Sequence, residues 1–270
     1  MTGGSMFRRP VATYGMDSES VGRILLDPAN PLCLISEGIK SGTTVLDVGA
    51  GNGVLAQLFL ARGISLCIDG VEPSADAVSL ASCHYRHLHH GALAEVMEHL
   101  SPTTYDHVVL ADVIEHTVDP SETLSLASAL LGADGRIWIS LPNVAFAPIR
   151  AELLHGSWTY SDWGILERSH LRFFTKASLK RLISDAGLEI ETIYHLGRSP
   201  FCMEKKLQDY PLNMLTLLQM KADPLAFTYQ FLAICRVQSK TGLSEMTEKW
   251  IDVDRRLLRK YYSLRSRINF

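Results

Sequence analysis

A glycine-rich segment constrains the fold of this chain more than any other feature. Residues 45–53 read V-L-D-V-G-A-G-N-G, an apolar run around Asp47 that leads into Gly49, Gly51 and Gly53. Glycines at alternate positions allow backbone torsions and a close ligand approach that side chains would block. A helical pattern follows directly, and the free N–H groups at its start face the same place. The segment therefore predicts a strand that stops at a ligand, in a tight turn before a helix.

The residues around this turn favour a cationic ligand that carries a ribose. The dinucleotide pattern G-x-G-x-x-G would need a glycine at Val54, and the Asp47 carboxylate would repel a pyrophosphate. Asp47 suits an ammonium group instead. Glu72, near the end of the next strand-like run, can accept hydrogen bonds from both ribose hydroxyls. S-adenosylmethionine has both groups, so the sequence predicts it as the cofactor.

Strand-like runs alternate with helical patterns along most of the chain, which predicts an α/β fold with a doubly wound, mostly parallel sheet. The expected strands lie near residues 44–48, 65–71, 86–90, 107–112, 136–141, 188–195 and 226–237. The expected helices lie near residues 54–62, 75–83, 121–131 and 176–186. Ligands of such sheets bind at the carboxyl ends of the strands, where Asp47, Glu72 and Asp112 fall.

Taken in order with the glycine turn, further segments resemble the class I S-adenosylmethionine-dependent methyltransferases. They are residues 71–74 (V-E-P-S) and 105–116 (Y-D-H-V-V-L-A-D-V-I-E-H). Residues 140–144 (S-L-P-N-V) and 164–175 (G-I-L-E-R-S-H-L-R-F-F-T) resemble a bacterial branch associated with glycosyltransferase and polysaccharide clusters. The resemblance spans residues 14–237. It implies a Rossmann-like, seven-stranded sheet with one antiparallel strand, 226–237, plus an inserted lid.

The resemblance also implies which residues bind the cofactor. They are Tyr14, Asp47, Gly49, Ala50, Gly51, Gly53, Glu72, Pro73, Ala92, Leu93 and Asp112. Tyr14 lies in a segment that can fold over the cofactor and contact its carboxylate. Many relatives carry an aspartate where this chain has Ala92, so adenine recognition is expected from backbone groups at residues 91–93.

The D-x-x-E-H run formed by Asp112, Glu115 and His116, together with the later His170, is the candidate catalytic cluster. It resembles the E-x-x-E-H metal site of ubiquinone-biosynthesis and small-RNA 2′-O-methyltransferases, with an aspartate in first place. A divalent ion there would lower the pKa of a substrate hydroxyl. Metal-free relatives carry the same run. The sequence favours His116, His170 and Asp112 as acid, base or orienting groups over a metal site. A purely structural role stays open.

Two segments fall outside the strand and helix alternation. Residues 143–175 form a long, aromatic-rich insertion, which predicts a substrate lid within a methyltransferase domain at 41–237. Residues 238–270 carry a charged helical pattern, which predicts a solvated helical extension or a homodimer arm. A surface for an anionic carrier or a membrane is the alternative. Residues 1–40 are expected to form helices that cover the cofactor.

Composition narrows the function classes. The net charge of -3 excludes a strong global attraction to nucleic acid and favours a small-molecule acceptor. The five cysteines are scattered and predict reduced thiols of a cytoplasmic protein, and neither a signal peptide nor a membrane span is expected. The expected activity is O-methylation of a small-molecule hydroxyl, of a sugar or glycoconjugate. The alternative is a non-catalytic, cofactor-binding regulatory or scaffold partner.

Overall fold

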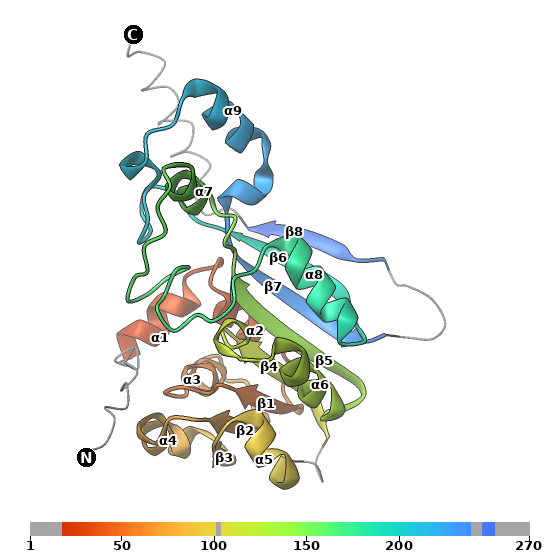
Figure 1. Ribbon diagram of the computed structural model, residues 1–270. Coiled ribbons are helices and arrows are strands. Elements are labelled where there is room, and N and C mark those ends of the chain that lie inside the picture. Colours follow the sequence, from red (N-terminus) through yellow and green to blue (C-terminus); the bar gives the residue numbers. More distant parts are fainter. Residues whose placement is uncertain (1–17, 101–103, 239–244, 252–270) are drawn as a thin grey trace, which may run out of the picture.

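A single mixed sheet runs through the protein (Figure 1). The computed structural model describes residues 18–100, 104–238 and 245–251. Within them the strand order is β3-β2-β1-β4-β5-β7-β6-β8. The strands are β1 Thr44–Val48, β2 Cys67–Glu72, β3 His87–His90, β4 Tyr105–Ala111, β5 Leu131–Pro142, β6 Leu188–Gly197, β7 Thr228–Val237 and β8 Thr247–Ile251. The neighbouring strands pair in parallel except where β7 lies between β5 and β6, antiparallel to both. This confirms the predicted doubly wound fold with one antiparallel strand, with an eighth strand added.

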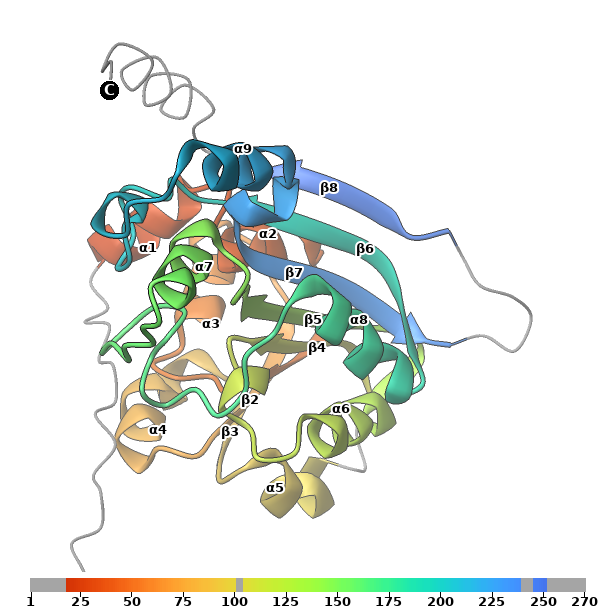
Figure 2. The same cartoon turned by 45° about the horizontal axis from the view of Figure 1, so that its top comes forward.

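Helices cover both faces of the sheet (Figures 1 and 2). They are α1 Ser18–Leu25, α2 Pro31–Gly38, α3 Val54–Ala61, α4 Ala75–Ala81, α5 Leu93–Leu100, α6 Pro120–Ala129, α7 Ala147–Leu154, α8 Lys176–Asp185 and α9 Met214–Ala222. One buried cluster joins α5, α6 and α8 to the sheet, and a second joins α2, α3 and α4 to its other face. The sequence predicted α3, α4, α6 and α8. It missed α5, α7 and α9.

Side-chain caps set where the predicted helices begin. Asp119 accepts hydrogen bonds from the N–H groups of Ser121 and Glu122, at 2.9 and 3.0 Å, and starts α6. At α8, the Thr175 hydroxyl accepts from the Ser178 N–H while the Ser178 hydroxyl accepts from the Thr175 N–H. Such caps satisfy N–H groups that have no partner inside the helix. The second of these caps also marks the end of residues 143–175.

The insertion at residues 143–175 leaves the sheet and returns to it at one place. The N–H of Val144 donates to the carbonyl oxygen of Phe174 at 2.9 Å, which closes the base of the segment. Its helix α7 packs against α9, and both lie at the same end of the molecule in the two views (Figures 1 and 2). The segment between β6 and β7 therefore forms an accessory lobe together with the predicted lid, a partnership that the sequence did not indicate.

The carboxyl-terminal prediction needs a correction. Residues 247–251 were expected to be helical, but they form strand β8, which pairs in parallel with β6. The Trp250 ring stacks on His195 with centroids 3.7 Å apart, and Glu248 binds the Lys176 ammonium at 2.7 Å. Tertiary contacts with the sheet edge thus override the helical charge pattern. Residues 252–270, where the dimer arm was expected, lie outside the described residues.

Two further observations concern the whole of the described chain. None of its helices combines the length and apolar character that crossing a bilayer requires. All five cysteines are free thiols, as the sequence indicated: Cys33, Cys67, Cys83, Cys202 and Cys235.

Candidate active site

The glycine turn between β1 and α3 has the left-handed backbone that the sequence predicted. The φ angles of Gly49, Gly51 and Gly53 are 75°, 52° and 79°, in the region that favours glycine. The N–H groups of Gly49 and Ala50 donate to the carbonyl oxygen of Val71 on β2, at 2.8 and 3.0 Å. A side chain added at Gly51 would meet no atom closer than 4.0 Å. The turn is thus held rigidly while Gly51 leaves open space for a ligand.

Glu72 lies buried at the end of β2, directly against this turn. One of its carboxylate oxygens accepts from the Gly51 N–H and the other from the Ser74 N–H, each at 2.8 Å. A carboxylate oxygen has two lone pairs, so each oxygen retains one for a further donor. The two backbone contacts fix the direction of the carboxylate. This arrangement fits the pair of ribose hydroxyls for which Glu72 was predicted.

Asp47 is buried at the end of β1, where the Tyr85 hydroxyl donates to it at 2.7 Å. Burial raises the pKa of the Asp47 carboxyl to about 7, and the charge of Glu72 adds to this, while the Tyr85 hydrogen bond opposes it. Sequence reasoning missed Tyr85, since no motif connects it to Asp47. A cationic ligand would favour the ionised carboxylate.

This raised pKa predicts that cofactor affinity depends on pH. A carboxyl that is protonated below pH 7 must lose its proton to face a cationic group, so protons compete with the ligand. Between pH 8 and pH 6 we expect the affinity for S-adenosylmethionine to fall about tenfold, as the ionised fraction falls. Calorimetric titrations at both pH values measure this. Asp47→Asn is the control, because in this variant only the ligand itself can titrate. If the affinity of the variant depended on pH as steeply as that of the parent, Asp47 would not be the group responsible.

Asp112 follows β4 in a strained conformation. Its φ of 56° is the only positive value among the described non-glycine residues. One of its carboxylate oxygens accepts from the Ser140 hydroxyl at 3.0 Å and from the side-chain amide of Gln230. Surrounding protein raises the pKa of the Asp112 carboxyl by desolvation, which those hydrogen bonds oppose. Ser140 and Gln230 were missed because they come from β5 and β7, far along the chain.

Glu115, His116 and His170 meet beside this position. One ligand atom from each lies within 4.8 Å of the others, and the two imidazole centroids are 4.7 Å apart. Glu115 is 1% exposed, and neither of its carboxylate oxygens has a hydrogen-bond partner among the described residues. Burial, and then the charge of Asp112, holds the pKa of Glu115 well above its usual range. The structure does not bring Asp112 into this cluster, although the sequence grouped all four.

Backbone carbonyls orient both histidines of the cluster. Nδ1 of His116 lies 3.3 Å from the carbonyl oxygen of Ser169, and Nδ1 of His170 lies 2.9 Å from that of Ile165. A carbonyl oxygen only accepts, so each Nδ1 carries the proton and each Nε2 presents a lone pair. Hydrogen-bond acceptors of this kind set the tautomer of metal-ligating or basic histidines. Burial lowers the pKa of His170, which keeps that ring neutral.

The return of residues 143–175 to the sheet explains why residues so distant in sequence meet. The N–H groups of Leu171 and Arg172 donate to the carbonyl oxygen of Glu115, at 2.8 and 3.0 Å. The Arg172 guanidinium donates to the carbonyl oxygen of Val118 at 2.8 Å. Arg172 therefore fastens residues 143–175 to the turn that follows β4.

The adenine end of the predicted site is only partly formed by the expected groups. Leu93 is buried in the core under α5, and the Ala92 N–H donates to the Glu95 carboxylate at 2.8 Å. Pro73 is exposed, and its carbonyl oxygen lies 3.2 Å from Nε2 of His90. Adenine recognition by backbone groups at residues 91–93 stays a prediction, and the Ala92 N–H is already paired with Glu95. Tyr14 lies outside the described residues.

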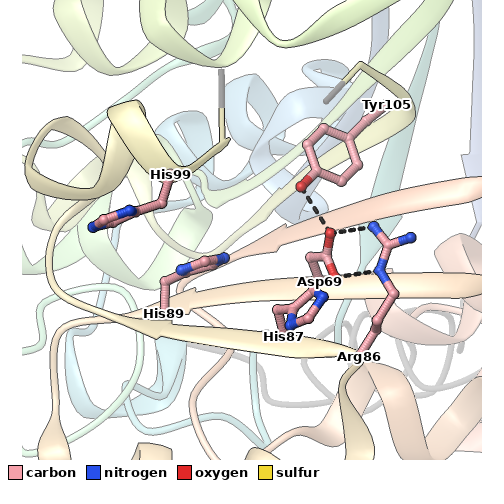
Figure 3. Close-up of a pocket in the computed structure, with 6 residues that line it drawn as sticks. All are labelled: Asp69, Arg86, His87, His89, His99 and Tyr105. Atoms are coloured by element: carbon pink, nitrogen blue, oxygen red, sulfur yellow. Dashed lines mark hydrogen bonds and ion pairs between the residues drawn. The ribbon is translucent and has the colours of Figure 1, made fainter. Parts of the chain in front are cut away.

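A separate groove of about 620 Å³ lies near the amino-terminal ends of β2, β3 and β4 (Figure 3). Its lining comprises Asp69, Arg86, His87, His89, His99 and Tyr105. Asp69 binds the Arg86 guanidinium at 2.9 Å and also accepts from the Tyr105 hydroxyl at 2.9 Å, so these charged groups satisfy one another. The His89 and His99 rings stack with centroids 6.0 Å apart. The side chains of this groove thus pair or stack with one another.

Comparison with known proteins agrees with this geometry. Residues 27–193 match the family described as "Methyltransferase domain". The ubiquinone biosynthesis O-methyltransferase of Pseudomonas paraeruginosa is 28% identical over 200 residues, which cover 67% of this chain and 80% of that protein. The protein of the same description from Dechloromonas aromatica is 28% identical over 213 residues, covering 70% and 85%.

Solved structures show the same fold. The magnesium protoporphyrin IX methyltransferase of Synechocystis with bound S-adenosylhomocysteine has a TM-score of 0.51 and 17% identity, covering 82% of this chain and 83% of that one. A methyltransferase from Archaeoglobus fulgidus has a TM-score of 0.51 and 19% identity, covering 76% and 93%. With the domain match over most of the sheet, these findings show that the chain belongs to the class I S-adenosylmethionine-dependent methyltransferases.

Proposed function

We propose that this enzyme methylates a hydroxyl group of a small molecule, and that Glu115, His116 and His170 hold a divalent cation beside that hydroxyl. The observation that carries the proposal is the buried Glu115 carboxylate without a hydrogen-bond partner in the described structure, next to the imidazoles of His116 and His170. An isolated buried carboxylate is costly unless a cation compensates it. The sequence alone favours a metal-free site; the side-chain geometry favours the cation.

The donor set suits particular metals. Two imidazole nitrogens and a carboxylate fit Mn²⁺, Fe²⁺ or Zn²⁺ better than Mg²⁺, which prefers oxygen ligands. Such a cation, when bound, lowers the pKa of a coordinated hydroxyl. The chain itself orients the donors through the carbonyl oxygens of Ser169 and Ile165. Asp112 is outside the donor set, and its contacts with Ser140 and Gln230 suit a role in positioning the cofactor.

Positioning accounts for most of the catalysis that we propose. S-adenosylmethionine supplies an electrophilic methyl group for an in-line displacement, a reaction that depends on alignment. Glu72 would orient the ribose, and Asp47 the cationic end of the cofactor. The hydroxyl proton needs an acceptor. The Nε2 lone pairs of His116 and His170 take that role if the site works without metal.

The exposed rings of the lid support a sugar or glycoconjugate as the acceptor. Tyr160 and Trp163 are 42% and 49% exposed, whereas Trp158 packs edge-on against Phe173 with centroids 5.1 Å apart. Exposed rings can stack on the apolar face of a sugar. The names of the relatives point to a ring hydroxyl of a quinone precursor as the competing acceptor class.

Free thiols at all five cysteines support the cytoplasm as the location of the protein.

The test separates acceptor use from cofactor binding. We expect methyl transfer from labelled S-adenosylmethionine to glycoside hydroxyls to exceed transfer to a catechol. Trp163→Ala should raise the acceptor KM about tenfold, because a stacked ring contributes roughly 1–1.5 kcal/mol. Its cofactor affinity should stay unchanged. Trp158→Ala is the matched control for lid packing, and we expect it to lower thermal stability instead.

Three outcomes of this assay would count against the proposal. Preferential methylation of the catechol would replace the sugar with a ring hydroxyl. A loss of cofactor affinity in Trp163→Ala would assign the lid to the cofactor pocket. Tight cofactor binding without transfer to any hydroxyl acceptor would favour the alternative, a regulatory or scaffold partner.

A further inference from the structure

We propose that Glu204, in the accessory lobe between β6 and α9, is a positioning residue for His170. Its carboxylate holds the N–H group of Ile165, the residue whose carbonyl oxygen accepts the His170 Nδ1 proton. Glu204 thereby keeps the proton on Nδ1 of His170 and leaves Nε2, which lies 4.0 Å from the Glu167 carboxylate, with its lone pair in the cluster of Glu115, His116 and His170. The inference rests on the proposed use of this cluster, and it adds a residue that no motif in the sequence indicates.

The hydrogen-bond chain is continuous across three segments of the protein. The Tyr229 hydroxyl on β7 donates to the Glu204 carboxylate, with distances of 3.2 and 3.3 Å to its two oxygens. Glu204 accepts from the Ile165 N–H at 2.8 Å, and the Ile165 carbonyl oxygen lies 2.9 Å from Nδ1 of His170. The chain thus runs from the sheet, through the accessory lobe, to the ring that closes the cluster.

The backbone beside Ile165 is shaped around the Glu204 carboxyl. Gly164 has a φ of 92°, and a Cβ atom added there would lie 2.2 Å from Cδ of Glu204. Glycine is therefore required both by the torsion and by the close approach of the carboxyl. Ile165 itself is 1% exposed and packs with Phe146 and Ile149. Without Glu204 its N–H would be buried without this acceptor, which disfavours the present loop conformation.

Two variants separate the effect of the length of the Glu204 side chain from the effect of its charge. Glu204→Gln keeps the side-chain length and an oxygen that accepts from Ile165, but it removes the charge. Glu204→Asp keeps the charge and withdraws the carboxylate by one methylene. If Glu204 acts by holding Ile165, Glu204→Asp should weaken Mn²⁺ affinity about tenfold, which is the smaller effect usually seen when a residue that orients a metal ligand is changed. Glu204→Gln should stay within about twofold of the parent. S-adenosylhomocysteine affinity should be unchanged in both variants.

The tautomer of His170 provides a second readout that needs neither metal nor acceptor. In the metal-free parent and in Glu204→Gln, imidazole ¹⁵N shifts should show Nδ1 of His170 protonated. Glu204→Asp should populate the Nε2-protonated tautomer as well. Parental Mn²⁺ affinity and a single tautomer in Glu204→Asp would overturn the inference, and so would equal losses in both variants. If the parent binds no Mn²⁺, the proposed metal role fails, while the tautomer comparison still decides the role of Glu204.

Discussion

Removing divalent metal should lower kcat/KM for the hydroxyl acceptor by about a hundredfold to a thousandfold, because metal activation contributes several kcal/mol. The physical reason is the Glu115, His116 and His170 cluster, in which a buried carboxylate has no hydrogen-bond partner within the described residues. Chelation followed by readdition of Mn²⁺ measures the effect. Activity should return with the metal, and Glu115→Gln should bind Mn²⁺ weakly by calorimetry.

The control is a histidine remote from the cluster. His99 lies on α5, against the groove at the other end of the strands. His99→Asn should bind Mn²⁺ and respond to chelation as the parent does, whereas His116→Asn should lose both. Full activity in the presence of chelator would instead leave His116 and His170 as bases or orienting groups, the interpretation that the sequence alone favours.

Replacing Glu72 with alanine should weaken binding of S-adenosylmethionine about a hundredfold. Two charge-assisted hydrogen bonds to the ribose would be lost, each worth roughly 1.5 kcal/mol or more. Glu72→Gln should also bind poorly, because both carboxylate oxygens accept from the N–H groups of Gly51 and Ser74 and an amide nitrogen cannot. Calorimetry on the folded variants measures both affinities.

An analogue separates ribose contact from support of the glycine turn. S-adenosylhomocysteine that lacks the 2′-hydroxyl should bind the parent less tightly than the complete ligand. In Glu72→Ala the two ligands should bind with equal affinity, because the 2′-hydroxyl in which they differ has lost the carboxylate that accepts its hydrogen bond. Equal discrimination in both proteins would refute the ribose assignment. Glu122→Ala, an exposed substitution in the first turn of α6, is the control for removal of a carboxylate.

The competition between local pattern and tertiary contact is clearest when the interior strand β7 is compared with the edge strand β8. The resemblance implied an antiparallel strand at residues 226–237, and the apolar run there suited a strand between two neighbours; both are confirmed by β7. The charged pattern at residues 247–251 predicted a helix and was wrong. At an exposed edge, half of each strand is polar, so its composition does not distinguish it from a solvated helix.

The sequence by itself determined the cofactor end of the site. Positive φ at Gly49, Gly51 and Gly53, and carboxylates at the ends of β1 and β2, follow from local chain geometry and from the common edge at which parallel strands end. Only the tertiary structure decided the catalytic end. Glu115 meets His170 because the N–H groups of Leu171 and Arg172 bind the Glu115 carbonyl oxygen, and the partners of Asp47 and Asp112 come from distant segments. Packing between elements sets such contacts, and no periodicity or spacing along the chain encodes them.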